Sequence, residues 1–245
     1  MMLGVEGNYS ACEIASGELS NFLEESLTED WTGFNLTMPL KESVFASDLI
    51  VFDDLSDSIR SANTLLRDKN GYRATSTDAT AFARLFSSIP NPRVAIIGGG
   101  GTARAALWAL SDRAESVDFL LRSPSRLDQM LKIAPELQMR ALPMDALIDG
   151  YDLVINTTPQ GGADHLVQSL KRADGLYFES LYKPWPTELS FAWRELGGKT
   201  MNGIDLLVEQ ALDALELMLS RSFDYEAMRR DLLTVALQAI SPQEE

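Results

Sequence analysis

The sequence predicts an α/β protein of two domains, the second built on a doubly wound parallel sheet. Residues 94–110 read as a short apolar run, four glycines and a helix-forming stretch. After them, apolar runs alternate with helix-like stretches, as expected for parallel strands joined by crossover helices. Before them, residues 87–93 read SSIPNPR, and the two prolines would end any arriving helix. This segment is therefore expected to be a joint between domains.

The second domain is predicted to span residues 89–204. Its first strand, at 94–97, is apolar and β-branched, as expected of a strand buried on both faces. The remaining elements follow in the same alternation. Further strands are expected at 116–121, 151–159 and 175–182, and helices at 103–110 and 125–134.

The first domain is predicted to comprise residues 1–88 plus 205–245, as a smaller α/β domain closed by C-terminal helices. Apolar residues recur at helical spacing after position 203 and predict one buried stripe. The stripe consists of Ile204, Leu207, Val208, Ala211, Leu215 and Met218. Strands are expected at 12–14, 33–38, 61–68 and 72–78, and helices at 16–27, from Pro39 onward, at 203–218 and at 224–240.

Composition excludes several classes of function. The formal net charge of −15 would repel a phosphate backbone, so no nucleic-acid partner is expected. The single cysteine, Cys12, excludes an internal disulfide and CxxC metal sites, and fits a reducing compartment. No metal is expected. No basic leader and no apolar run of the ~18 residues needed to span a bilayer is visible, so a cytoplasmic protein without a membrane partner is expected.

The glycine run lies where a phosphate-binding loop is expected, between a strand and a helix. Small residues permit the tight turn, and the backbone N–H groups at the helix start can bind a diphosphate. The order of strand, glycines and helix predicts a Rossmann-type dinucleotide site. The alternative is a flexible turn without a ligand. The residues predicted to bind the cofactor here are Gly98, Gly99, Gly100, Gly101 and Thr102.

The residues after the second strand favour NADP as that dinucleotide. NAD sites place an acid at the end of this strand, whereas NADP sites place arginine there for the 2′-phosphate. Arg122, Ser123 and Arg126 follow the strand, and Asp118 lies too early in it to face the ligand. Arg104 is expected to add charge to the same pocket. The alternative is that these arginines are solvated loop charges.

Ordered motifs along the chain give it a family resemblance. GFNLTMPLK, SANTLL, TSTDATAF, GGGGTARAAL, LRSPSR, DLVINTTPQG, LYKPWPT and NGIDLLVEQAL occur in the order found in shikimate dehydrogenases. The set covers about residues 8–220, and TMPLK resembles the actinobacterial branch. The resemblance implies reversible reduction of 3-dehydroshikimate to shikimate with NADPH, in the chorismate pathway to aromatic amino acids.

The resemblance also implies roles for individual residues. Lys41 and Asp78 match the catalytic pair; an ammonium can stabilise and protonate the ketone oxygen, and a carboxylate can orient it. From the residues alone these two would be ordinary surface charges. The resemblance assigns the substrate to Thr37, Asn63, Tyr182 and Gln210. It assigns the cofactor further to Asn156, Thr157 and Gly203.

Two departures from the family pattern bear on activity. The usual Asn-Thr-Asp reads Ser76-Thr77-Asp78 here. The family's first strand and its S-x-S-P loop, whose serines hold the substrate carboxylate, have no counterpart in these residues. The expectation is therefore that the natural start lies upstream, or that substrate binding is impaired.

Two other functions compete with the leading interpretation. One is a quinate/shikimate dehydrogenase that uses NAD, against which Arg122 argues. The other is a non-catalytic or regulatory nucleotide-binding paralogue, which the missing loop favours and the intact Lys41 and Asp78 oppose. The small-molecule partner is expected to be shikimate or 3-dehydroshikimate, and both a monomer and a homodimer fit the family.

Overall fold

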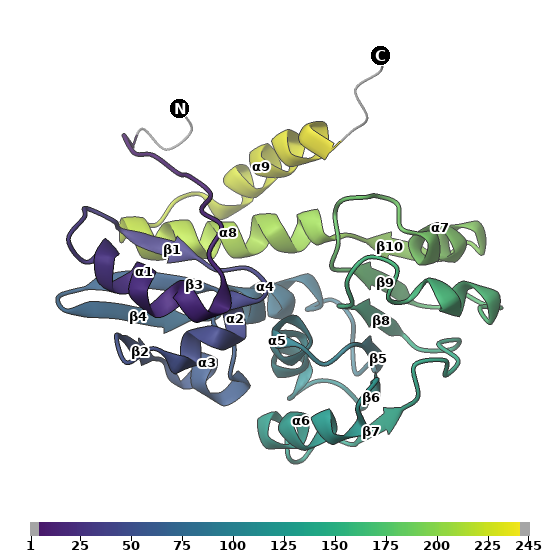
Figure 1. Cartoon of the computed structure of the whole chain (residues 1–245). Coiled ribbons are helices and arrows are strands. Elements are labelled where there is room, and N and C mark those ends of the chain that lie inside the picture. Colours follow the sequence, from purple (N-terminus) through teal and green to yellow (C-terminus); the bar gives the residue numbers. More distant parts are fainter. Residues whose placement is uncertain (1–4, 241–245) are drawn as a thin grey trace.

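Two β-sheets organise the computed structural model, which describes residues 5–240. Each sheet forms the centre of one lobe, and the long helix α8 starts beside the second lobe and runs along the first (Figure 1). The predicted joint at 87–93 lies between the last helix of the first lobe and the first strand of the second. The predicted two-domain α/β fold with one parallel sheet is confirmed.

The second lobe contains a six-stranded sheet in the order β10-β9-β8-β5-β6-β7, with every pair parallel. All four predicted strands are present in it, and the short edge strands β7 and β10 were not predicted. The strands are β5 (Arg93–Ile97), β6 (Ser116–Leu120), β7 (Met139–Leu142), β8 (Leu153–Asn156), β9 (Leu176–Glu179) and β10 (Lys199–Met201). The helices are α5 (Gly101–Leu110), η3 (Pro124–Arg126), α6 (Leu127–Ile133), η4 (Asp164–Gln168) and α7 (Glu188–Glu195).

The apolar run of β5 is continuous because the strand is covered on both faces. Val94 and Ile96 pack into the core that contains the alanines of α5. Ala95 and Ile97 pack into the opposite core, with Trp193 of α7. Since successive side chains of a strand point to opposite faces, both sets must be apolar.

The first lobe contains a four-stranded mixed sheet in the order β1-β3-β4-β2. The predicted hairpin around the KNG turn is confirmed as the antiparallel pair β3–β4, and β2 adds to β4 in parallel. The strands are β1 (Gly33–Asn35), β2 (Ile50–Phe52), β3 (Thr64–Asp68) and β4 (Gly71–Thr75). The helices are η1 (Ser16–Glu18), α1 (Leu19–Ser26), α2 (Leu40–Ser43), η2 (Val44–Ala46), α3 (Asp54–Ile59) and α4 (Thr77–Leu85).

The predicted strand at 12–14 is wrong, because this segment is irregular. A strand needs a neighbour for its backbone N–H and C=O groups. Within residues 5–240, the sheet of the first lobe consists of β1, β3, β4 and β2, and residues 12–14 pair with none of these strands. The sequence pattern of residues 12–14 could not reveal that this segment lacks a neighbouring strand to pair with.

Two helices complete the structure, as predicted: α8 (Gly203–Leu219) and α9 (Tyr225–Ile240). The side chains of Asn202 and Asp205 form a capping box that fixes the start of α8. Further along, α8 packs against α4 and α9. Its buried side includes Ile204, Val208 and Leu212, whereas Leu207 of the predicted stripe is 40% exposed. Among residues 5–240, every helix is too short or too polar to span a bilayer.

Candidate active site

Lys41 and Asp78 form an ion pair between two helices of the first lobe. Lys41 Nζ lies 2.7 Å from Asp78 Oδ2, and the side chains are 19% and 6% exposed. The turn after β1 leads into α2 and places Lys41, while α4 begins one residue before Asp78. A carboxylate in the first turn of a helix is favoured by the helix dipole. The two residues form a largely buried charged couple at one face of the lobe.

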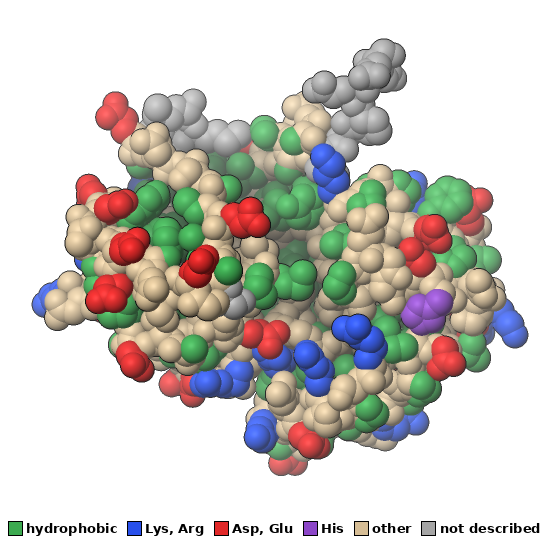
Figure 2. All heavy atoms as spheres, viewed as in Figure 1, with side chains coloured by type: hydrophobic (Ala, Val, Ile, Leu, Met, Phe, Trp, Pro, Cys, Tyr) green, Lys and Arg blue, Asp and Glu red, His purple; other side chains and the backbone are tan. Residues whose placement is uncertain are grey.

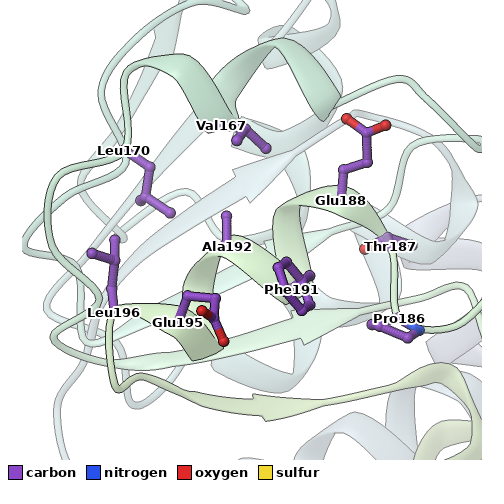
Figure 3. Close-up of a pocket in the computed structure, with 9 residues that line it drawn as sticks. All are labelled: Val167, Leu170, Pro186, Thr187, Glu188, Phe191, Ala192, Glu195 and Leu196. Carbon is purple, nitrogen blue, oxygen red and sulfur yellow. The ribbon is translucent and has the colours of Figure 1, made fainter.

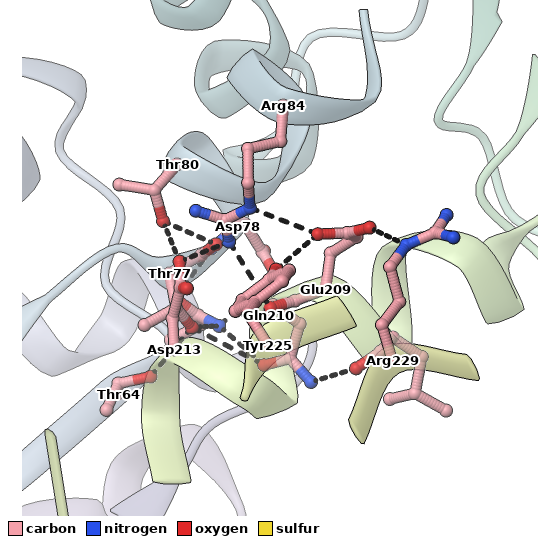
Figure 4. A network of polar contacts seen from close by, with 12 residues as sticks. Thr64, Thr77, Asp78, Thr80, Arg84, Glu209, Gln210, Asp213, Tyr225 and Arg229 are labelled. Carbon is pink, nitrogen blue, oxygen red and sulfur yellow. Dashed lines mark hydrogen bonds and ion pairs between the residues drawn. The ribbon is translucent and has the colours of Figure 1, made fainter. Parts of the chain in front are cut away.

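Two of the predicted substrate residues join this couple. The Asn63 Nδ2 amide donates to Asp78 Oδ1 at 3.2 Å, to Thr77 Oγ1 at 2.8 Å and to Gln210 Oε1 at 3.1 Å. Gln210 reaches the site from α8, far away in the sequence (Figure 4). The structure therefore brings Lys41, Asp78, Asn63 and Gln210 into one hydrogen-bonded group.

Gln210 is held in place by a second polar network that ties α8 to α4 and α9. Arg84 lies between two acids of α8: its Nε is 3.0 Å from Glu209 Oε2 and its Nη2 is 2.6 Å from Asp213 Oδ2. Tyr225 and Arg229 of α9 also donate to Glu209 (Figure 4). Burial acts to raise the pKa of Glu209, but these hydrogen bonds outweigh it and lower the pKa below its usual value. The network fixes the rotation of α8, and with it the direction of Gln210.

Thr37 and Tyr182 lie outside this hydrogen-bonded group. Thr37 is exposed in the turn before α2, where its carbonyl accepts from Leu40 N at 2.7 Å. Tyr182 is 43% exposed after β9. Both side chains are accessible to a ligand, and neither is bonded to the Lys41–Asp78 ion pair.

The glycine loop has the backbone shape that only glycine tolerates. Gly98 has a φ of +106°, and a Cβ there would lie 2.5 Å from Thr157 Oγ1. That hydroxyl donates to Ile97 O at 2.9 Å, which fixes the end of β8 against the loop. Gly101 then opens α5, followed by Thr102, so the N–H groups at the helix start have no partner within the helix.

The side chain of Asn156, at the end of β8, is directed into the protein. Asn156 is 4% exposed, and its Nδ2 donates to Glu179 Oε2 at 2.9 Å and to Tyr177 OH at 3.2 Å. Glu179 also accepts from Thr187 Oγ1 and from Leu181 N. Burial raises the pKa of the Glu179 carboxyl above its usual value. Sequence reasoning missed Glu179; the available signal was one acid ending an apolar strand.

Of the two predicted arginines after β6, Arg126 contacts the glycine loop. Arg122 and Ser123 are exposed, and Arg126 Nη1 donates to Gly99 O at 2.9 Å. Asp118 is 3% exposed and bound by Arg140, at 2.6 and 2.8 Å. The hydrogen bond from Arg140 lowers the pKa of Asp118. Its carboxylate is thus paired away from the loop, as its place in the strand predicted.

The expectation that Arg104 adds charge to the nucleotide pocket is wrong. Arg104 is 3% exposed, and it donates to Ile59 O at 2.6 Å and to Arg60 O at 2.8 Å in the first lobe. Its Nη2 also lies 3.3 Å from Glu42 Oε2. A position in the first turn of a helix does not reveal in which direction the side chain points. Here the Arg104 side chain points towards the first lobe.

A hollow separates the two lobes, and Lys and Arg side chains gather along its lower border (Figure 2). A second, apolar groove of about 660 Å³ lies between η4 and α7 and contains none of the predicted site residues (Figure 3). Its lining includes Val167, Leu170, Phe191 and Leu196. Within residues 5–240, no three His, Cys, Asp or Glu side chains are grouped so as to hold a metal ion.

Gly203 has a packing requirement beyond its predicted cofactor role. A Cβ at this position would lie 2.2 Å from Ser180 O, which is backbone, and Gly203 N donates to Leu181 O at 3.2 Å. We therefore expect Gly203→Ala to lower the free energy of unfolding by about 2–3 kcal/mol, as overpacking does. Urea denaturation measures it. Gly17→Ala, where a Cβ meets nothing within 4 Å, is the control. Equal stability of the two variants would contradict the packing argument.

Comparison with known proteins agrees with this geometry. Residues 1–65 match the family model of the shikimate dehydrogenase substrate binding domain. The chain is 34% identical to the shikimate dehydrogenase (NADP(+)) of Pyrobaculum islandicum, over 94% of this chain and 88% of that protein. The chain belongs to the shikimate dehydrogenase family. A second relative, the shikimate dehydrogenase (NADP(+)) of Rhodopseudomonas palustris, is 31% identical over 97% of this chain and 88% of its own length.

Solved shikimate dehydrogenases share the fold of both lobes. The Mycobacterium tuberculosis enzyme superposes with a TM-score of 0.81 at 25% identity, covering 91% of this chain and 86% of that one. The Thermus thermophilus enzyme, in complex with NADP(H) and shikimate, gives 0.80 at 26% identity, covering 96% and 90%. The family resemblance and the predicted fold are both confirmed.

Proposed function

We propose that this chain catalyses the reversible, NADP-dependent reduction of 3-dehydroshikimate to shikimate. The observation that carries the proposal is the adjacency of two sites. Lys41, paired with Asp78, is followed by Glu42, whose carboxylate accepts from Gly101 N at 3.0 Å. The residue after Lys41 therefore contacts the start of the helix that follows the glycine loop, which brings the Lys41–Asp78 pair close to the predicted dinucleotide site. The relatives named shikimate dehydrogenase (NADP(+)) support the same reaction.

The loop fits a phosphorylated dinucleotide. A carboxylate already accepts from the first amide of α5, which supports anion binding at this helix start. We propose that Gly98, Gly99, Gly100, Gly101 and Thr102 hold the diphosphate and that Arg122, Ser123 and Arg126 hold the 2′-phosphate. We propose Asn156, Thr157 and Gly203 as the remaining cofactor residues, with Asn156 acting from behind through its bonds to the strand ends.

The chemistry follows from the charged couple. Bound NADPH would supply the hydride that reduces the ketone carbon. The Lys41 ammonium stabilises the charge that develops on the ketone oxygen and gives it a proton, and Asp78 keeps the ammonium aimed. Asn63 and Gln210 present amide groups for the substrate hydroxyls, and Thr37 and Tyr182 complete the contacts at the rim.

We further propose that the substrate domain comprises residues 1–88 and 205–245 and the nucleotide domain 89–204. The C-terminal segment supports this division because α8 packs on α4 of the first lobe. The TMPLK sequence supports an actinobacterial-type member of the family, and the single exposed thiol of Cys12 supports a cytoplasmic protein.

The choice of cofactor is tested by Arg122→Ala. Arg122 is exposed and follows Leu121, which lies against Gly99 of the loop. If its guanidinium binds only the 2′-phosphate, the Kd for NADP⁺ should rise about tenfold, as for the loss of one charge-assisted hydrogen bond, while weak binding of NAD⁺ is unchanged. Calorimetric titration with both nucleotides measures this. Arg194→Ala, an exposed arginine on α7, removes the same charge elsewhere. A wild-type protein that does not bind NADP⁺ would disprove the proposed function, and equal losses for NADP⁺ and NAD⁺ would disprove the role of Arg122.

A further inference from the structure

One carboxylate of the first domain lies over the glycine loop of the second. Glu42 Oε1 accepts from Gly101 N at 3.0 Å, and a Cβ on Gly100 would lie 3.5 Å from the same oxygen. The N–H groups at the start of a helix lack intrahelical partners, and they are the donors that bind phosphate oxygens in dinucleotide sites. Glu42 thus uses a donor that the diphosphate of a dinucleotide would need.

Arg104 is fixed in the protein, whereas the Glu42 side chain that it contacts is half exposed. Arg104 is 3% exposed and is fixed by the carbonyls of Ile59 and Arg60 at the end of α3. The Glu42 side chain is 48% exposed and lines a groove of about 480 Å³, whose wall also carries the cations Arg60 and Lys132. The carboxylate therefore has space to leave Gly101 and cations beside which to remain.

We propose that the Glu42 carboxylate accepts from the Gly101 amide when no dinucleotide is bound, and that the diphosphate replaces it at this amide when a dinucleotide binds. The inference rests on the proposed function, and it adds a competitor to the binding site. The Gly101 amide proton cannot bond fully to both the Glu42 carboxylate and the diphosphate, and two anions at hydrogen-bond distance from one amide repel each other. The apparent affinity for the dinucleotide is therefore lower than the loop alone would give.

The test uses the variant Glu42→Gln, which keeps the shape of the side chain and removes its charge. We expect the Kd for NADP⁺, measured by calorimetric titration, to fall about tenfold. The Kd for adenosine 2′-monophosphate, which has the 2′-phosphate but no diphosphate, should not change. Both measurements read binding and are independent of turnover.

A matched control separates this effect from a general change in charge. Asp57→Asn removes one negative charge from the same groove, but Asp57 pairs with Arg60 Nη1, at 2.8 Å, and not with the loop. An affinity for NADP⁺ that is unchanged or weaker in Glu42→Gln would overturn the inference. So would an equal gain in Asp57→Asn, or an equal gain for adenosine 2′-monophosphate. A wild-type chain that binds no NADP⁺ would instead overturn the proposed function, and this inference with it.

Discussion

Replacing Lys41 with alanine should lower kcat for shikimate oxidation by about 10³-fold, because the group that exchanges a proton with the reacting oxygen and stabilises its charge is lost. Steady-state assays with shikimate and NADP⁺ measure the effect. The Kd for NADP⁺ should remain within a factor of about two, since Lys41 pairs with Asp78 and not with the loop.

Lys69→Ala is the matched control for Lys41→Ala. Lys69 is exposed in the turn between β3 and β4, so its removal changes the net charge equally without touching the buried pair. Turnover that survives in Lys41→Ala at the level of the Lys69→Ala control would remove Lys41 from the chemistry.

Asp78→Asn should lower kcat by about 10²-fold. The substitution keeps the size of the side chain but removes the charge that holds Lys41 Nζ at 2.7 Å. It also allows the new amide to face Asn63 Nδ2, donor against donor, so the hydrogen-bonded group must rearrange. Steady-state kinetics on the folded variant, with circular dichroism as the check of folding, measure the loss.

The double variant tests whether the two residues act as one unit. If Asp78 acts by positioning Lys41, the variant with both substitutions should be no slower than Lys41→Ala alone. Multiplied losses in the double variant would show that Asp78 has a separate role in the reaction.

Most of the second lobe could be predicted because the sequence patterns that indicate its elements are local. The run at 94–97, the four glycines and the alternation after them each report on neighbouring residues in the chain, and the structure confirms the parallel sheet. The edge strands β7 and β10 escaped because strands of three or four half-exposed residues carry too little pattern.

The substrate site could not be predicted from local pattern alone. Asn63 and Gln210 are 147 positions apart, and only the packing of α8 on α4 brings their amides to 3.1 Å. The family resemblance named them; periodicity left Gln210 as an unremarkable position beside the apolar stripe. Likewise, nothing local predicted that Glu42 and Arg104 face each other across the two lobes.

The two crossings of the chain between the lobes determine how the hollow can open. One crossing is the 87–93 segment, where Pro90 and Pro92 restrict the backbone, and the other is the capped start of α8 at Asn202. Both connections restrict the backbone, so we expect any opening of the hollow to be a rotation of the lobes about the region where the chain crosses between them. Such a rotation would bring a bound hydride donor and ketone together along a similar arc in every cycle.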